Sequence, residues 1–263
     1  MTLDPPLCVP LSWQRIDFIS DLHLDASELD TYEAWVQYMA TTPANALFIL
    51  GDLFEVWVGD DNTDPFALQC QTVLKTAAKR MAVYLMCGNR DFLLGPDFFK
   101  TTGIHRLNDP TVLEVQPDTR FLLSHGDSLC LDDHDYLAFR AEVRRPEWQQ
   151  HFLAKPLAER EAFARELRRQ SEARKKTQTD YADVDTAAAL DWLTQANAEV
   201  LIHGHTHKPA EHDLGANKTR WVLSDWHANA TPARLEVVTW LRDKAQDTKT
   251  QSPSKGLCRL QLS

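Results

Sequence analysis

Five short stretches of this 263-residue chain carry side chains that commonly bind divalent metal ions. In chain order they are Asp21-Leu22-His23, Gly51-Asp52, Gly88-Asn89-Arg90-Asp91, His125-Gly126-Asp127 and His203-Gly204-His205-Thr206-His207. Imidazole, carboxylate and amide oxygen without thiolate suit Mn²⁺, Fe²⁺ or Mg²⁺ better than a structural zinc ion. Two such ions that share one carboxylate form a clamp for phosphate ester hydrolysis. The residue types therefore indicate metal-dependent phosphoester chemistry.

Each stretch is weak evidence by itself. A single Asp-x-His after a strand is more often a cap with a hydrogen-bonded histidine, and a single Gly-Asp is usually a turn. The last stretch is stronger because three imidazoles within five residues seldom have a packing reason. The occurrence of all five, each after an apolar run, favours a metal site over the structural explanation.

Glycines adjoin most of these candidate ligands. The chain has only nine glycines, and four of them fall beside a candidate ligand: Gly51, Gly88, Gly126 and Gly204. A missing side chain lets the backbone turn tightly or lets a phosphate approach closely.

The apolar runs that precede the five stretches predict buried strands. They cover residues 16–19, 46–50, 83–86, 121–123 and 200–202. Helical patterns at 27–39 and 65–80 lie between some of them, and 111–115 and 235–241 predict antiparallel strands, so the class is α/β with two packed sheets. Ligands of open α/β sheets collect outside the carboxyl ends of strands, so the five stretches are expected to meet in one crevice.

Residues 136–193 lack strand signals and are rich in Glu, Arg, Ala and Gln. Their apolar side chains recur at steps of three, four or six residues and predict amphipathic helices, which we interpret as an inserted cap. A helical hairpin that only covers a sheet edge is the alternative. The main domain is expected to span 1–243, and the polar, aperiodic sequence that follows predicts a disordered tail over 244–263.

The ordered set of five motifs resembles the calcineurin-like metallophosphoesterase superfamily. Four longer blocks are similar to its UDP-2,3-diacylglucosamine hydrolase family of the lipid A pathway. These blocks are Gly51 to Glu55 running on to Gly59-Asp60-Asp61, then Gly88 to Gly95, His125 to Cys130 with Asp132-Asp133, and Ile202 to Ala210. The resemblance covers roughly residues 16–241.

This resemblance implies a four-layer αββα sandwich with an inserted helical cap and two Mn²⁺ ions per chain. One ion would be bound by Asp21, His23 and His205. The other would be bound by Asn89, His125 and His203, with Asp52 bridging both. His207 would lie outside this ligand set. The catalytic residues implied are Asp52, Asn89, Arg90 and His125.

Arg90 stands where many relatives in the superfamily have a histidine that acts as general acid. A guanidinium does not donate a proton at neutral pH, but it holds a phosphate through two hydrogen bonds and stabilises developing charge. A phosphate leaving group needs no general acid, so arginine here favours a pyrophosphate bond as the bond that is cleaved. The alternative is that Arg90 only pairs with Asp91 or Asp127.

The activity implied is hydrolysis of UDP-2,3-diacylglucosamine to UMP and 2,3-diacylglucosamine 1-phosphate, by metal-activated water attack on the UMP phosphorus. The implied substrate-binding residues are Asn89, Arg90, Asp133, Ser171, Lys175, Gln178 and His203. The sequence departs from the family's cap motif at Lys175 and Gln178. Two alternatives stay open: a metal-dependent hydrolase of soluble nucleoside diphosphate sugars, and a metal-free scaffold.

The composition excludes several classes of protein. Hydrophobic residues make up 43% and charged residues 25%, as in a globular chain with a core, and no apolar run is long enough to cross a bilayer. The first residues do not resemble a secretory signal, and five scattered cysteines without CxxC favour reduced thiols in the cytoplasm. A net charge of -10 argues against nucleic-acid binding.

The charge is uneven along the chain. Between Arg140 and Lys176 there are eleven Lys or Arg and six Asp or Glu, a local +5. A basic, partly apolar cap could bind a diphosphate and the cytoplasmic face of the inner membrane, where a diacylated substrate resides. Solvated ion pairs along helices are the alternative. No obligate protein partner is evident.

Overall fold

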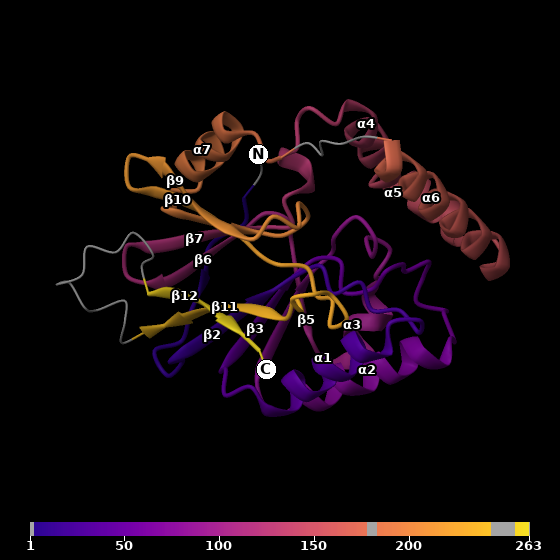
Figure 1. The fold of residues 1–263 in the computed structure, drawn as a ribbon, viewed down its shortest axis with the longest axis horizontal. Helices are drawn as coiled ribbons and strands as arrows, with labels where there is room; N and C mark the ends of the chain where they lie inside the picture. Colours follow the sequence, from indigo (N-terminus) through magenta and orange to yellow (C-terminus); the bar gives the residue numbers. More distant parts are fainter. Residues whose placement is uncertain (1–2, 178–182, 243–255, 263) are drawn as a thin grey trace.

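The predicted strands are present because a run that is apolar on both faces is stable only between two layers. The computed structural model describes residues 3–177, 183–242 and 256–262. These residues form two six-stranded sheets packed face to face (Figure 1). The predicted α/β class and the two packed sheets are confirmed.

The first sheet carries three of the five candidate ligand stretches. Its parallel strands are β2 (Arg15–Ile19), β3 (Ala46–Leu50), β4 (Ala82–Met86) and β5 (His105–Leu107). Beside β2 lies β11 (Glu236–Leu241), which is antiparallel as predicted, and β12 (Leu257–Gln261) pairs antiparallel with β11 at the edge.

The second sheet carries the other two stretches on parallel neighbours, β7 (Thr119–Ser124) and β8 (Val200–His203). On one side β6 (Thr111–Gln116) is antiparallel to β7, as predicted, and β1 (Leu7–Cys8) lies parallel beyond it. On the other side β10 (Lys218–Val222) is parallel to β8, and β9 (Ala210–Gly215) forms the antiparallel edge.

The layers follow from the alternation of side chains along each strand. In β3, Phe48 and Leu50 point into the core between the sheets, whereas Leu47 and Ile49 point to the helices outside. Those helices are α1 (Leu29–Thr41), α2 (Pro65–Ala77) and α3 (Pro96–Thr102). On the far side α7 (Thr186–Gln195) covers the second sheet. The four layers are therefore αββα, as the resemblance implied.

Three helices form the cap: α4 (His134–Val143), α5 (Pro146–Leu153) and α6 (Leu157–Thr177). They extend from one end of the sandwich, above the loops that leave β2, β3 and β4 (Figure 1). The predicted boundary at residue 193 is wrong, because α7 packs Ala189 and Leu193 against Leu122 and Leu201 of the second sheet. Helical periodicity alone does not distinguish a helix of the cap from one that covers a sheet.

The predicted tail over 244–263 is wrong for its last part. Leu257–Gln261 pairs with β11, and Leu257 is buried in the core between the sheets, so the domain does not end at 243. The sequence did not predict this strand because it is short, follows a polar stretch and pairs with a strand that is separated from it in the chain. Residues 243–255 lie outside the described part.

Leu257→Ala tests whether this last strand stabilises the domain. Because Leu257 is 5% exposed, its truncation leaves a cavity and lowers the free energy of unfolding by about 2 to 4 kcal/mol. Gln261→Ala, at an exposed position of the same strand, changes it by less than about 0.5 kcal/mol. Urea unfolding measures both, and equal effects would contradict the burial of β12.

Candidate metal centre and substrate cavity

The loops that leave five strands meet at one end of the sandwich and are hydrogen-bonded to one another. The amide of Asp21 donates to the carbonyl of Gly51 (3.1 Å) and the amide of His23 donates to that of Asp52 (3.0 Å). Between the loops of the second sheet, the amide of Gly204 donates to the carbonyl of His125 (3.0 Å), and across the sheets the amide of His205 donates to Asp21 Oδ2 (2.9 Å). The structure thus brings together the stretches that the sequence placed at strand ends.

Asp52 lies between two histidines that were assigned to different metal ions. Its Oδ2 is 3.9 Å from His23 Nε2 and 3.7 Å from His125 Nε2. Its Oδ1 accepts a hydrogen bond from the amide of Arg90 (2.8 Å), which fixes the orientation of the carboxylate. This is the placement that a bridging carboxylate requires.

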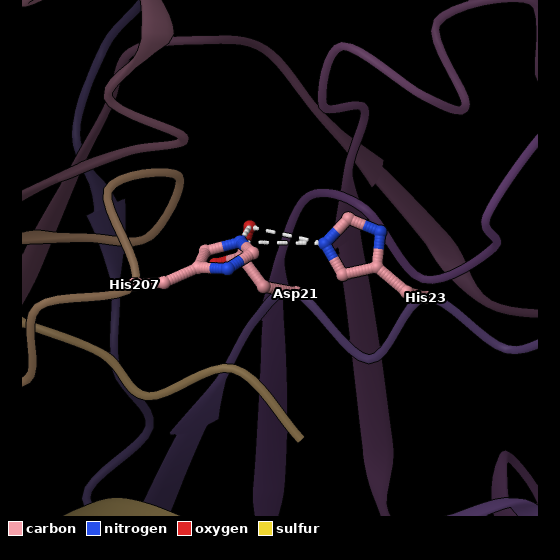
Figure 2. A group of neighbouring side chains, drawn as sticks. All are labelled: Asp21, His23 and His207. Carbon is pink, nitrogen blue, oxygen red and sulfur yellow. Dashed lines mark hydrogen bonds and ion pairs between the residues drawn. The ribbon is translucent and has the colours of Figure 1, made fainter. Parts of the chain in front are cut away.

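Two groups of potential ligand atoms share Asp21. One is Asp21, His23 and His207, and the other is Asp21, Asp52 and His125; within each group the ligand atoms lie within 4.8 Å of one another. Figure 2 shows the first group, in which one ring nitrogen of His23 is directed toward both His207 and the Asp21 carboxylate. The donors are imidazole nitrogens and carboxylate oxygens, which suit a divalent ion.

The structure places His207 and His205 differently from the implied ligand set. His207 Nε2 is 3.3 Å from Asp21 Oδ1 and 3.3 Å from His23 Nε2, although sequence reasoning left it outside the set. His205, the implied ligand, has its Nδ1 2.9 Å from Asn89 Oδ1, and its backbone amide donates to Asp21 (2.9 Å). The spacing of three imidazoles in one stretch was the available signal, but it does not say which ring reaches which carboxylate.

His125 and His203 are held as metal-binding histidines commonly are. Nδ1 of each is hydrogen-bonded to a backbone carbonyl, that of Leu50 (2.9 Å) and that of Gly204 (2.8 Å) respectively. This leaves Nε2 of each ring to bind an ion. Nε2 of His203 is buried and has no hydrogen-bond partner among the described residues. A buried nitrogen without a partner fits a metal site.

The backbone is strained at this site. Asp21, His23, Asp52, His205 and His207 all have positive φ angles, between 48° and 67°. Such conformations cost non-glycine residues free energy, and they persist where the surrounding structure imposes them, often at functional sites. Here they turn each strand end sharply enough to direct its side chain inward.

Two glycines are required by close approach. A Cβ on Gly88 would lie 2.2 Å from Asp52 Oδ1, and a Cβ on Gly204 would lie 2.3 Å from Asp21 Oδ2. No side chain fits at either position without displacing a carboxylate. The sequence predicted a tight turn or a close phosphate as the reason for glycine, and at these two positions the structure shows that glycine leaves room for the carboxylates of Asp52 and Asp21.

Burial and neighbouring charges shift the pKa values of the cluster in opposite directions. Burial alone would raise the pKa of Asp21, but His207, His125 and His23 hold it well below its ordinary value. Burial would lower the pKa of His125, but the charges of Asp52, Asp127 and Asp21 raise it to about 9. For His203 burial dominates and lowers the pKa to about 3.

Asp91 and Asp127, which belong to the same motifs, hold the loops around the centre. Asp91 accepts hydrogen bonds from the amides of Leu53 (2.8 Å) and Gly88 (2.7 Å) and so joins two ligand-bearing turns. Asp127 accepts from the Tyr136 hydroxyl and from Arg140 Nε (2.8 Å), and so joins the centre to α4.

Arg90 pairs with a residue that sequence reasoning gave no role. Its Nη1 is 3.4 Å from Glu55 Oε1. Arg90 therefore pairs with Glu55, whereas the alternative had it paired with Asp91 or Asp127. The Glu55 carboxylate lies 3.3 Å from Nε of Arg168 in the cap and 3.0 Å from Nδ1 of His23. Glu55 therefore holds two guanidinium groups beside the candidate metal ligands. Burial would raise the pKa of Glu55, but the hydrogen bond with His23 and the charges of Arg90, His23 and Arg168 lower it to about 2.

A cavity of about 980 Å³ opens between these groups and the cap. Asn89, Arg90 and Asp133 line it, and Asp133 also caps α4 by accepting from the amide of Tyr136 (3.1 Å). Much of the remaining wall is apolar: Phe54, Val56, Trp57, Phe66, Trp148, Phe152, Phe163 and Leu167. The cavity joins a polar end beside the candidate metal ligands to an apolar end under α5 and α6.

The structure does not test three of the implied substrate contacts. Ser171 and Lys175 lie on α6, but their side chains are outside the described part, as is the whole of Gln178. His203 is fully buried and does not line the cavity.

Known proteins that this chain resembles agree with one another in family and in name. The model of the family described as calcineurin-like phosphoesterase matches residues 14–209. A Chromobacterium violaceum protein named UDP-2,3-diacylglucosamine hydrolase is 48% identical over 81% of this chain and 90% of its own. Proteins of the same name from Bordetella pertussis and Stenotrophomonas maltophilia are 42% and 40% identical over 82% and 86% of this chain, which covers 87% and 96% of them.

Asp52→Asn tests the bridging position. Because this carboxylate lies between both groups of ligands, its loss lowers the affinity for Mn²⁺ by at least about tenfold and reduces the ions bound per chain. Isothermal titration calorimetry measures both quantities. Asp97→Asn, at an exposed position of α3, is the control, and an unchanged affinity in Asp52→Asn would exclude the bridging role.

Metal binding by His125 is expected to release a proton. With a pKa of about 9, the metal-free side chain is protonated at pH 7.5, whereas a metal ion binds the neutral ring. The affinity therefore increases with pH until about pH 9 and then levels off. Calorimetry in buffers of different ionisation enthalpy counts the protons, and a heat independent of the buffer would contradict the raised pKa.

Proposed function

The chain belongs to the calcineurin-like phosphoesterase family, and from this we propose that it hydrolyses the pyrophosphate bond of UDP-2,3-diacylglucosamine with two Mn²⁺ ions, releasing UMP and 2,3-diacylglucosamine 1-phosphate. The names of relatives at 40 to 48% identity support this substrate. The structural observation that carries the proposal is the continuity between the polar centre and the apolar cavity, since Asn89 and Arg90 border both.

The side chains of the centre fit two hard or borderline divalent ions. The potential ligands in the centre are Asp21, His23, Asp52, Asn89, His125, His203 and His207, and none of them is a thiolate. Bound ions would polarise the phosphate and lower the pKa of an attacking water. The protein itself orients the ligands through the hydrogen bonds to Asp52, His125 and His203.

Two arginines supply the charge that a diphosphate needs. Arg90 and Arg168 share the carboxylate of Glu55, so both guanidinium groups stand at the polar end of the cavity. Guanidinium groups bind phosphate oxygens in pairs and stabilise charge that develops on a phosphate leaving group. Since that leaving group needs no proton, the site is suited to a phosphoric anhydride without a general acid.

The apolar end of the cavity suits acyl chains. Aromatic rings of the cap pack together there: Trp148 and Phe152 stack with centroids 4.7 Å apart, and Phe163 lies edge-on to Phe152 at 5.2 Å. A soluble nucleotide sugar has no apolar chain to pack against such a wall. Each enclosed methylene of an acyl chain, in contrast, makes binding more favourable. This favours the diacylated substrate over soluble nucleoside diphosphate sugars.

The same surface supports a position on the cytoplasmic face of the inner membrane. In the described part of the chain no helix has both the length and the apolar character needed to span a bilayer. Val56 and Phe163 line the cavity but are 45% and 39% exposed, and Leu153 of the cap is 39% exposed. Lys155 lies near Leu153, in a segment with a local charge of +5. Apolar and basic side chains together favour peripheral binding to anionic lipid.

UMP release from UDP-2,3-diacylglucosamine, with UDP-N-acetylglucosamine in parallel, tests the reaction. We expect Mn²⁺-dependent release from the diacylated substrate that EDTA abolishes, and at least about a hundredfold lower kcat/KM without acyl chains, because the apolar wall is then unused. Phe152→Asp should lower kcat/KM only for the diacylated substrate. Equal turnover of both compounds would favour a hydrolase of soluble sugars.

Flotation with vesicles tests the membrane position. Vesicles with anionic lipid are expected to carry the protein at low salt and to release it at high salt, because screening weakens surface charge interactions. Lys155→Glu should reduce flotation severalfold, whereas Lys79→Glu, an exposed charge reversal after α2, should not. Absence of flotation at low salt would exclude peripheral binding.

A further inference from the structure

The segment Gly59-Asp60-Asp61 belongs to the loop between β3 and α2, and two of its residues contact the cap. Asp60 is turned inward and accepts hydrogen bonds from Trp57 Nε1 (3.1 Å) and from the amides of Gly95 and Phe98 (2.9 Å each). Gly59 and Asp61 instead face Arg160, which comes from the first turn of α6.

Arg160 is an almost completely buried guanidinium, with 1% of the residue exposed. Its Nη1 donates to the carbonyl of Val58 (2.5 Å) and to Asp61 Oδ1 (2.8 Å), and its Nη2 donates to Asp61 Oδ2. Its Nε donates to the carbonyl of Lys155 (3.0 Å). A buried charge is destabilising unless it is paired and hydrogen-bonded in this way.

The loop is shaped to admit this side chain. Gly59 has a φ of +136°, and a Cβ there would lie 2.3 Å from Arg160 Nη1 and 2.9 Å from Leu153 Cδ2. The Val58 carbonyl, Gly59 and Asp61 thus form a socket for one guanidinium, here named the Arg160 socket. Other arginines of α6 are unlike it: Arg165 and Arg169 are 69% and 73% exposed and pair with glutamates on the same helix.

The Arg160 socket joins the two walls of the apolar cavity. Val56 and Trp57, just before the socket, line one wall, and Phe163 and Leu167, one and two turns after Arg160, line the other. Arg168 follows at once and reaches Glu55 beside the candidate metal ligands. Arg160 therefore attaches the first turn of α6, the helix that carries one wall and Arg168, to the loop that carries the other wall.

We propose that Arg160 and its socket position the acyl-binding wall of the cap. They thereby determine how strongly kcat/KM depends on the length of the acyl chains. This inference rests on the proposed function, since it needs a diacylated substrate. Arg160 does not line the cavity, so it acts through α6 and not by touching the substrate.

Kinetics with substrates of increasing acyl-chain length test the proposal. In the unaltered enzyme kcat/KM is expected to rise by up to about fourfold per methylene, the effect of enclosing one CH₂ group. In Arg160→Met, which keeps an unbranched side chain but removes the guanidinium and its hydrogen bonds, the rise should fall to about twofold or less. KM for the longest chain should increase by about tenfold or more, as expected for loss of a paired charge. The kcat at saturation and the affinity for Mn²⁺ should stay within about twofold.

Matched variants separate positioning from general stability. Arg169→Met removes an equal charge from an exposed position of the same helix and should leave the chain-length dependence unchanged. Asp61→Asn should shift it in the same direction as Arg160→Met, and the double variant should be no worse than Arg160→Met alone if the pair acts as a unit. If Arg160→Met does not fold, Asp61→Asn decides, because the Asp61 side chain is 62% exposed.

An unchanged chain-length dependence in folded variants would overturn the proposal. So would an equal loss of rate at every chain length, since that is the result of destabilisation alone. If the unaltered enzyme releases no UMP from any diacylated substrate, the proposed function fails and this inference fails with it. The two failures are therefore distinguished by the unaltered enzyme.

Discussion

The confinement of two buried carboxylates, Asp21 and Asp52, beside one cluster of imidazoles is the constraint on which the rest of the structure depends. Like charges out of water repel one another and lose hydration, so they persist only among opposite charges and hydrogen-bond donors. Here the donors are backbone amides and the opposite charges are histidines. The two parallel strand groups supply these partners because their carboxyl ends meet at one end of the sandwich.

This confinement explains local features that would otherwise be unfavourable. Positive φ angles at the two carboxylate residues and at three neighbouring histidines bend the strand ends inward, and glycines leave room for the carboxylates to touch the backbone. The cost of strain is offset by the packed sheets beneath, whose inner strands are fully buried. A rigid sandwich thus holds a cluster that isolated loops would not maintain.

The cap adds an apolar environment beside the polar centre. Its helices contact the centre through charges, Arg140 on Asp127 and Arg168 on Glu55, and contact the neighbouring loop through Arg160 on Asp61. Between these contacts its aromatic side chains enclose an apolar cavity. The polar centre and the apolar wall therefore share one opening.

The sequence by itself determined the α/β class, the strands that end in ligand residues, the glycines beside them and the presence of a helical cap. These are local patterns, in which a few neighbouring residues fix the outcome. Only the tertiary structure decided that His207 rather than His205 faces Asp21 and His23, that Glu55 joins Arg90 to Arg168, that α7 covers the second sheet, and that β12 completes the first. Each of these depends on a partner far away in the chain, and side-chain type and spacing do not encode which distant group a ring, a guanidinium or a strand edge will meet.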